Sequence, residues 1–453
     1  MNKTDINIKR LIWLYLFFLI FEGALRKWIL PQYSSLLLIV RDPILLGIYA
    51  LAMVRGFFPT NAFVVSVTVF AFLSFFTSFA GDGVLPITMF GLRANYLHLP
   101  LIFLMPKVMT LKDVKQMGFF LLLISPLMAA LAVKQFNADA NDWINAGTGG
   151  QIGGQLFATG KRVRPAGTFS FVNGMVSYLS VITAFLLFNF LEGKLYPKWL
   201  VVSSGVSLSF ALAVSGSRSA VAAVTIVCLM VAIICLTNTA KFGRALLPLF
   251  LFYLTFYGLT NLAPVFNEAL ASQKTRFEES GGFKEGMLKR YFMEFPQAID
   301  AGLNAPILGH GIGMGTNAAA GMLNEGRRSF MLAEGEWMRV VLELGPFLGF
   351  GYILLRVILA FYLLREAFRP LKRGHTAAFL LVGAVFLDVF TGQFGQPTAL
   401  GFTVFIAGLV LAATRITEES EPKATATKLS TGKNPSIFGR SKYADQLHGP
   451  SSA

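Results

Sequence analysis

Arginines inside or beside apolar segments are the residues of this chain most able to do chemistry. Arg218 interrupts FALAVSGSRSAVAAVTIV (210–227), between two runs apolar enough for lipid, where a charged side chain costs roughly 3 kcal/mol even on the milder scales. Arg164 lies beside Gly and Thr, ahead of another apolar run. Neither arginine has an acidic neighbour in the sequence, and guanidinium donors match the oxygens of a phosphate or diphosphate. We therefore predict a site for an anionic, membrane-bound ligand; snorkelling to lipid headgroups is the alternative for either residue alone.

Two more arginines, Arg290 and Arg339, belong to the long loop that we predict on the same side of the membrane. Both are candidate diphosphate contacts, although Arg290 could be solvated and Arg339 stands at helical spacing from Glu336 for an ion pair. After Arg290, apolar residues recur every three to four positions and predict an amphipathic helix on the membrane surface: Phe292, Phe295, Ile299 and Leu303.

Three residues of the same loop could act as a general base. Glu334 and Glu336 precede the next apolar run, and His310 lies in the glycine-rich APILGHGIG. Glu336 has the ion pair with Arg339 as its alternative, and His310 could merely fill a turn. The predicted outward loops contain no Asp-x-Asp and no His/Cys ligand cluster. The sequence thus gives no sign of a metal site, and we expect no cofactor.

The composition indicates that the candidate residues are positioned by transmembrane helices. Of the 453 residues 55% are hydrophobic and only 14% are charged, whereas soluble domains carry roughly a quarter charged residues. The sequence predicts an all-α polytopic membrane protein of about twelve transmembrane helices, with the first one retained rather than cleaved as a signal peptide. The predicted segments are 11–27, 34–54, 61–80, 84–106, 117–136, 173–191, 199–215, 219–237, 245–262, 338–363, 376–394 and 398–414.

Lys and Arg in alternate short connections predict the orientation. These connections would be cytoplasmic, so both termini lie inside and the two long loops, about 137–172 and 263–338, face the periplasm. The transmembrane domain is predicted over 1–415 and a disordered cytoplasmic tail over 416–453.

Other membrane-embedded charges have acidic neighbours. Glu22 stands four residues before Arg26, and Asp42 follows Arg41. We expect these to be structural pairs that hold helices together.

Four stretches, in this order, resemble the O-antigen ligase and O-antigen polymerase superfamily: RPAGTFSFVNGMVSYL (164–179), SGSRSA (215–220), KRYFMEFPQAIDAGLNAPILGHGIGMGTN (289–317) and AEGEWMRVVLELGPFLG (333–349). The motifs cover about 164–349, and the remainder is similar only in topology. FEGALRKW (21–28) and RDP (41–43) resemble segments of exopolysaccharide relatives.

The resemblance implies a C-type integral-membrane glycosyltransferase of the bacterial inner membrane. It would move a glycan from an undecaprenyl-diphosphate carrier to a lipid or glycan acceptor at the periplasmic face, in lipopolysaccharide or exopolysaccharide synthesis, without a metal and without nucleic acid. Arg218 would then stabilise charge on the leaving diphosphate. The family's His-Asn pair, about eleven residues before Gly345, is replaced by Glu334 and Gly335, which leaves the acceptor open.

Two other functions remain alternatives at this stage. A transporter or flippase of lipid-linked oligosaccharide would also have about a dozen spans, but the sequence shows no matching halves with broken helices. A non-catalytic scaffold would not need arginines at the outer membrane boundary. Ligase and polymerase activities are not separated by any residue.

Overall fold

The computed structural model describes residues 3–81, 83–153, 162–279, 281, 293–316, 319 and 335–415. These residues are helical with turns and loops, and they contain no β-strand, as expected for an all-α membrane protein. Residues Met1–Arg415 form one compact unit. The predicted tail, 416–453, and the candidate residues Arg290 and Glu334 lie outside the described residues.

The helices follow the predicted apolar segments along the chain. In order they are α1 (Lys3–Ala24), α2 (Ser34–Leu37), α3 (Arg41–Val54), α4 (Ala62–Ala80), α5 (Leu85–Leu92), α6 (Leu101–Val108), α7 (Leu111–Asn137), α8 (Val172–Glu192), α9 (Lys198–Val214), α10 (Arg218–Thr237), α11 (Phe242–Leu262), α12 (Pro264–Glu279), α14 (Glu294–Asn304), α16 (Glu336–Lys372), α17 (Ala377–Thr391) and α18 (Pro397–Ala413). Short π-helical segments, Leu25–Ile29 and Arg93–Leu97, extend α1 and α5.

Within the described residues, seven helical stretches are long and apolar enough to cross a membrane, and an eighth is formed if the bent pair Leu85–Leu97 and Leu101–Val108 is one span. Three more apolar helices, α9, α17 and α18, have 15 to 17 residues. The protein is therefore a multi-pass membrane protein, while the number of twelve spans stays a prediction.

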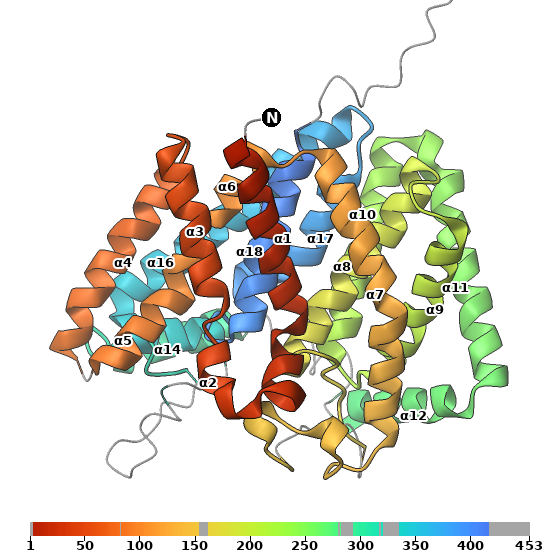
Figure 1. The fold of residues 1–453 in the computed structure, drawn as a ribbon, viewed down its shortest axis with the longest axis horizontal. Coiled ribbons are helices and arrows are strands. Elements are labelled where there is room, and N and C mark those ends of the chain that lie inside the picture. Colours follow the sequence, from red (N-terminus) through yellow and green to blue (C-terminus); the bar gives the residue numbers. More distant parts are fainter. Residues whose placement is uncertain are drawn as a thin grey trace, which may run out of the picture. The chain divides into compact units, whose positions relative to one another are not determined.

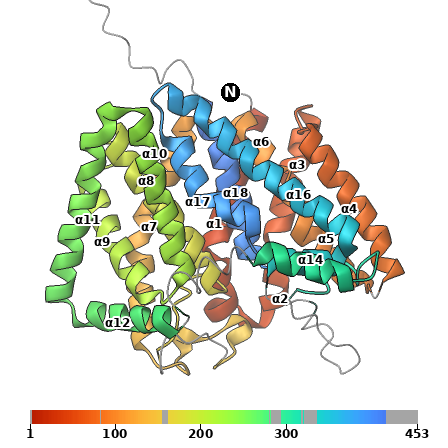
Figure 2. The ribbon, with the colours of Figure 1, turned by 180° about the vertical axis from the view of Figure 1, so that it is seen from behind.

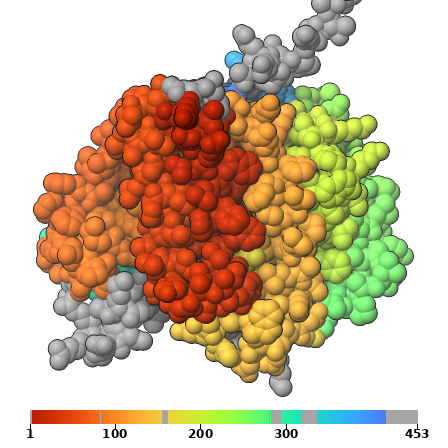
Figure 3. Space-filling model, in the orientation of Figure 1, coloured from red at the N-terminus to blue at the C-terminus, as the bar shows by residue number. Residues whose placement is uncertain are grey.

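The centre of the bundle is built from α8, α17 and α18. Every residue of α18 from Ala399 to Ala413 is buried, as expected for a helix that is apolar all round and surrounded by other helices. At the other extreme, only Ala245 is buried in α11, so α11 lies at the periphery (Figures 1 and 2). Figure 3 shows the face covered by the N-terminal helices and α7.

Two helices, α12 and α14, run across the bundle rather than along it, and both lie at the end opposite the N-terminus (Figures 1 and 2). We call this the loop end, because the connection between α7 and α8 lies there as well. The other end, which we call the N-terminal end, holds the start of α1 and the last turns of α16. The described parts of both long connections lie at this loop end of the bundle, and the side of the membrane that they face stays a prediction.

Candidate functional site

The turn between α9 and α10 places Arg218 at the loop end. Gly216 adopts a left-handed φ of 52°, which a residue with a Cβ rarely adopts. The Ser215 hydroxyl accepts a hydrogen bond from the Ser217 amide (3.2 Å), and the Ser217 side chain accepts one from Ala220 N (3.3 Å), which caps α10. Arg218 is therefore the first residue of α10 and is half-buried. The local sequence SGSRS explains this geometry fully.

A polar pocket lies beside this turn. It has a water-accessible volume of about 90 Å³ and is bordered by α8, α10, α14, α17 and α18. Its lining residues are Asn173, Val176, Ser177, Ser219, Glu294, Leu387, Asp388, Thr391, Gly392, Gln393 and Ala399. Ser219 follows Arg218 directly, so the N-terminus of α10, with its partial positive charge, stands at the edge of the pocket.

Hydrogen bonds between the pocket side chains fix their orientation. Asn173 donates to Gln393 (3.1 Å) and to Gln396 (2.8 Å) through its amide nitrogen. The Ser177 hydroxyl donates to Asp388 Oδ2 at 2.8 Å. The other oxygen, Asp388 Oδ1, accepts no hydrogen bond from any residue that the structure describes. One carboxylate oxygen of Asp388 is thus held in place while the other is available to a ligand.

A second carboxylate, Glu294 of α14, reaches the pocket from the loop end. Glu294 Oε2 accepts a hydrogen bond from the Trp337 amide at 3.2 Å, which ties α14 to the first turn of α16. The face of α14 that packs against the bundle carries the buried Ala298 and Ala301. The predicted apolar positions of this helix are exposed instead: Phe295, Ile299 and Leu303. An exposed apolar face at this end suits a helix that lies in the membrane interface.

Behind the pocket, two carboxylates and two guanidiniums form a closed buried network. Glu336 accepts hydrogen bonds from Arg339 (2.8 and 2.9 Å), Arg356 (3.0 Å) and the Phe394 amide (3.1 Å). Arg339 also donates to Glu343 at 2.7 Å. All four charged side chains are at least nine-tenths buried, and their formal charges cancel. Arg356 donates to the Gly392 carbonyl at 2.7 Å, so the network supports the pocket wall.

The glycine-rich loop that contains His310 wraps around this network. The amides of Gly313 and Gly315 donate to the two oxygens of Glu343 at 2.9 and 2.8 Å. Gly313 has a φ of 91°, and a Cβ there would lie 2.5 Å from the carbonyl oxygen of Ile87. The contact with Ile87 therefore fastens the glycine-rich loop to α5. His310 lies in this loop, with its amide bound to the Leu342 carbonyl at 3.0 Å, and it is not among the residues that line the polar pocket.

The segment that contains Arg164 is held by α1 and α7. Lys27, in the π-helical end of α1, donates to the Gly167 carbonyl at 2.6 Å, and Gln135 accepts from the Gly167 amide at 2.8 Å. The Thr168 hydroxyl donates to the Ile20 carbonyl at 2.6 Å. RPAGTF and FEGALRKW, which are far apart in the sequence, thus pack together. Arg164 itself is half-buried.

The expected structural pairs are present in part. Glu22 binds Arg26 (3.2 Å) as predicted, and its second oxygen binds Arg41 (3.1 Å). The prediction that Asp42 pairs with Arg41 is wrong, because Asp42 binds Arg93 and His98 instead. Adjacent residues of a helix point in different directions and do not face each other.

An apolar groove runs along α10. It begins near the first turn of this helix and extends toward the N-terminal end of the bundle. It has a volume of about 450 Å³ and is formed by α8, α9, α10 and α11. Val221, one turn after Arg218, lies on its wall, and Val202 and Leu249 are exposed along it. The rest of its lining is also mainly apolar: Leu186, Leu187, Phe190, Val201, Leu208, Leu212, Val224, Pro248, Leu251 and Phe252. This groove can accept a long hydrocarbon.

The structure brings only some of the sequence-predicted residues together. Ser219, the residue after Arg218, lines the polar pocket, whereas Glu336 and Arg339 bind each other in the network behind it. His310 and Arg164 lie in two other segments, the glycine-rich loop and the segment before α8. Sequence reasoning missed Asp388, although a single carboxylate in the apolar run 376–394 was a signal for it, because an ionisable residue inside a membrane segment is a functional-site candidate.

Comparison with known families gives a match over part of the chain. Residues 203–353, about a third of the chain, match the family model described as O-antigen ligase. The match includes the turn with Arg218, the amphipathic helix α14, the glycine-rich loop and the first half of α16. The search of curated proteins found no match.

Proposed function

We propose that this chain, which carries an O-antigen ligase domain over residues 203–353, transfers a glycan from an undecaprenyl-diphosphate carrier to an acceptor at the periplasmic face of the inner membrane. The family match supports glycan transfer in polysaccharide synthesis. The observation that carries the finer proposal is that a polar pocket at the N-terminus of α10 and an apolar groove along the same helix lie within one turn of each other.

The donor would use both features. A diphosphate at the start of α10 meets the Arg218 guanidinium and the positive end of the helix dipole. The polyprenyl chain would then lie in the groove, where each buried methylene contributes about 0.8 kcal/mol. Arg164 and Arg290 are proposed as further contacts of the diphosphate.

The acceptor would bind on the other side of the pocket. Its hydroxyl oxygen attacks the anomeric carbon of the donor sugar while the bond from that carbon to the diphosphate oxygen breaks. The hydroxyl proton passes to a base, and the new negative charge on the diphosphate is stabilised by Arg218. No metal takes part in the proposed step.

We assign the base to Asp388, because this residue lines the pocket and Ser177 donates to Oδ2, while Oδ1 accepts no hydrogen bond from the described residues. Glu336 is a weaker candidate, since Arg339, Arg356 and the Phe394 amide all donate to it. For the same reason Arg339, which binds two carboxylates, is proposed to hold the pocket wall rather than the diphosphate. Glu334 and His310 remain the alternative bases.

The proposed orientation places the loop end in the periplasm and both termini in the cytoplasm, as the distribution of Lys and Arg predicts. The acceptor is a lipid or a growing glycan of the O-antigen or exopolysaccharide type. Ligase and polymerase would share the donor site and differ in what enters from the acceptor side.

The test compares variants of two arginines, Arg218 and Arg162, in cells that make the carrier-linked glycan. Arg218→Ala should lower transfer by roughly 10²- to 10³-fold, the loss typical for one group that stabilises developing charge. Arg218→Lys should recover little, because an ammonium lacks the planar fork. Arg162→Ala is the matched control, since Arg162 is a loop-end arginine bound to the exposed Glu268, and it should keep wild-type transfer.

Carrier-linked glycan must also be located. An inactive transferase leaves it on the periplasmic side, whereas an inactive flippase leaves it on the cytoplasmic side, so cytoplasmic accumulation would replace the proposed function by the transporter. Wild-type transfer by Arg218→Ala would remove Arg218 from the mechanism. Asp388→Asn should abolish transfer while leaving the amount of inserted protein unchanged; if it retains full turnover, the base is one of the other candidates, Glu334, Glu336 or His310.

A further inference from the structure

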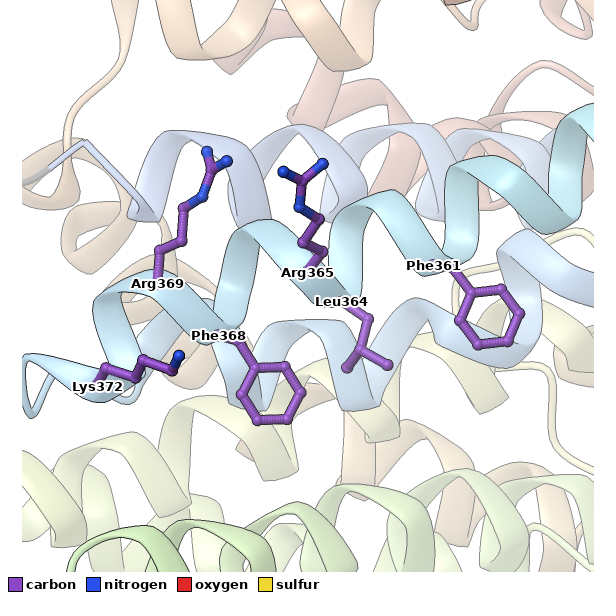
Figure 4. Close-up of a pocket in the computed structure, with 6 residues that line it drawn as sticks. All are labelled: Phe361, Leu364, Arg365, Phe368, Arg369 and Lys372. Carbon is purple, nitrogen blue, oxygen red and sulfur yellow. The ribbon is translucent and has the colours of Figure 1, made fainter.

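A second pocket lies at the opposite end of the molecule from the proposed active site. It is formed on the last turns of α16, at the N-terminal end of the bundle, and has a volume of about 500 Å³. Its lining residues are Phe361, Leu364, Arg365, Phe368, Arg369 and Lys372, as Figure 4 shows. None of them belongs to the matched family region, which ends at residue 353.

The six side chains are sorted by chemistry around the helix. At 3.6 residues per turn they occupy about 140° of the circumference, with Phe361, Leu364 and Phe368 along one edge and the three cations along the other. Figure 4 shows Arg365 and Arg369 pointing to one side of α16 and the apolar side chains to the other. The pocket therefore offers an apolar strip next to a row of positive charge.

The aromatic side chains of the strip are held in place from α17. The ring of Phe368 packs against Phe379 with centroids 4.7 Å apart, and Phe361 packs edge-on against Phe386 at 5.8 Å. From Phe361 to Lys372 the helix rises about 16 Å, which is close to half of a bilayer's hydrocarbon core, about 15 Å. The apolar strip and the cations together are thus about as long as the hydrocarbon layer of one leaflet.

The charge of the pocket is only partly compensated by protein. Arg369 binds Glu366 at 2.5 Å. Arg365 and Lys372 are exposed and form no hydrogen bond or ion pair with any residue that the structure describes. Two positive charges next to an apolar surface leave room for one anionic group with an attached hydrocarbon chain.

We infer that this pocket binds an anionic phospholipid of the cytoplasmic leaflet, with its phosphate on Arg365 and Lys372 and an acyl chain along Phe361, Leu364 and Phe368. The positive charge near this end of the bundle places it in the cytoplasmic leaflet, whose anionic lipids attract basic residues beside a transmembrane helix. The inference is independent of the proposed glycan transfer, because the site lies at the other end of the molecule.

The experiment uses the full-length protein, delipidated in a neutral detergent and titrated with phosphatidylglycerol or phosphatidylcholine, with bound lipid counted by native mass spectrometry. The wild-type protein should prefer phosphatidylglycerol. Each cation near a membrane surface contributes about 1 kcal/mol, so the double variant Arg365→Gln, Lys372→Gln should bind it about 20- to 30-fold more weakly. The matched control, Arg10→Gln with Lys112→Gln, removes two exposed cations outside the pocket and should leave binding unchanged.

Two further arms decide the nature of the occupant. Inorganic phosphate in excess should not displace phosphatidylglycerol from the wild-type protein, because it has no chain for the apolar strip; complete displacement would show a soluble-anion site and overturn the inference. Phe361→Ser should weaken binding, whereas Phe347→Ser, an exposed apolar residue elsewhere on α16, should not. Equal binding of phosphatidylglycerol and phosphatidylcholine by the wild-type protein would also overturn the inference. This comparison does not depend on how any variant folds.

Discussion

Replacing Glu336 by glutamine should destabilise the protein before it affects any chemistry. The buried network contains Arg339 and Arg356 against Glu336 and Glu343, so the substitution leaves one uncompensated positive charge among side chains that are at most 7% exposed. Removing one partner of a buried ion pair typically costs about 3–5 kcal/mol. The amide would also present two donors where Arg339 and Arg356 need an acceptor.

Thermal unfolding of the purified protein in detergent, followed by tryptophan fluorescence, measures this cost. Trp337 is next to Glu336 and donates to the Phe390 carbonyl at 2.8 Å, so its emission reports on the network directly. The control is Glu268→Gln, which removes the acid of an exposed pair with Arg162 and should cost less than about 1 kcal/mol.

A second substitution separates charge from chemistry. Adding Arg356→Met to Glu336→Gln makes the buried group neutral again, so the double variant should be more stable than the sum of the single effects predicts, by about 0.5–3 kcal/mol. If Glu336→Gln instead unfolds like the wild type but has lost glycan transfer, the structural reasoning fails and Glu336 is the base that its position in the sequence suggested.

Three further predictions concern other parts of the molecule. Gly205→Leu should lower transfer without loss of stability, because Gly205 lines the apolar groove and a Cβ there meets no atom within 4 Å; Gly258→Leu, on α11 with equally open surroundings, is the control that should keep full activity. Gly313→Ala should cost about 1–3 kcal/mol, since it combines a left-handed φ with a contact to a backbone carbonyl, and limited proteolysis of the outward loop would detect the loosening. Lys27→Met should lower transfer about tenfold in a membrane-inserted protein, because losing a charged hydrogen bond of about 1.4 kcal/mol frees the segment that carries Arg164; unchanged activity would show that Gln135 alone is enough.

The helices were predictable from the sequence because each has its own apolar run. The predicted segment 61–80 is α4, Ala62–Ala80, and 173–191 is α8, Val172–Glu192. The segment 84–106 was read as one span, but the structure bends it by 42° between Leu97 and Leu101. A π-helical segment precedes this bend and Pro100 lies within it, and hydropathy alone does not show the bend.

The partners of the charged residues were less predictable. Spacing along a helix identified Glu22 with Arg26 and Glu336 with Arg339, because residues three or four apart share a face. Arg356, twenty residues from Glu336, also binds it, and no periodicity points to that contact. The same holds for Ser177 and Asp388, which come from α8 and α17. Contacts between distant helices follow from packing, which a single sequence does not encode in a readable pattern.

The scarcity of buried residues in α11 has a consequence for how a long-chain substrate is loaded. A helix with a single buried residue is held mainly by the surrounding lipid, and it forms one wall of the groove. Displacing such a wall sideways disturbs few protein contacts, so the polyprenyl chain of the proposed donor would enter the groove laterally from the bilayer without passing α12 and α14. Turnover would then depend on the thickness and fluidity of the membrane around α11, and two lipid compositions should give different rates with the same enzyme.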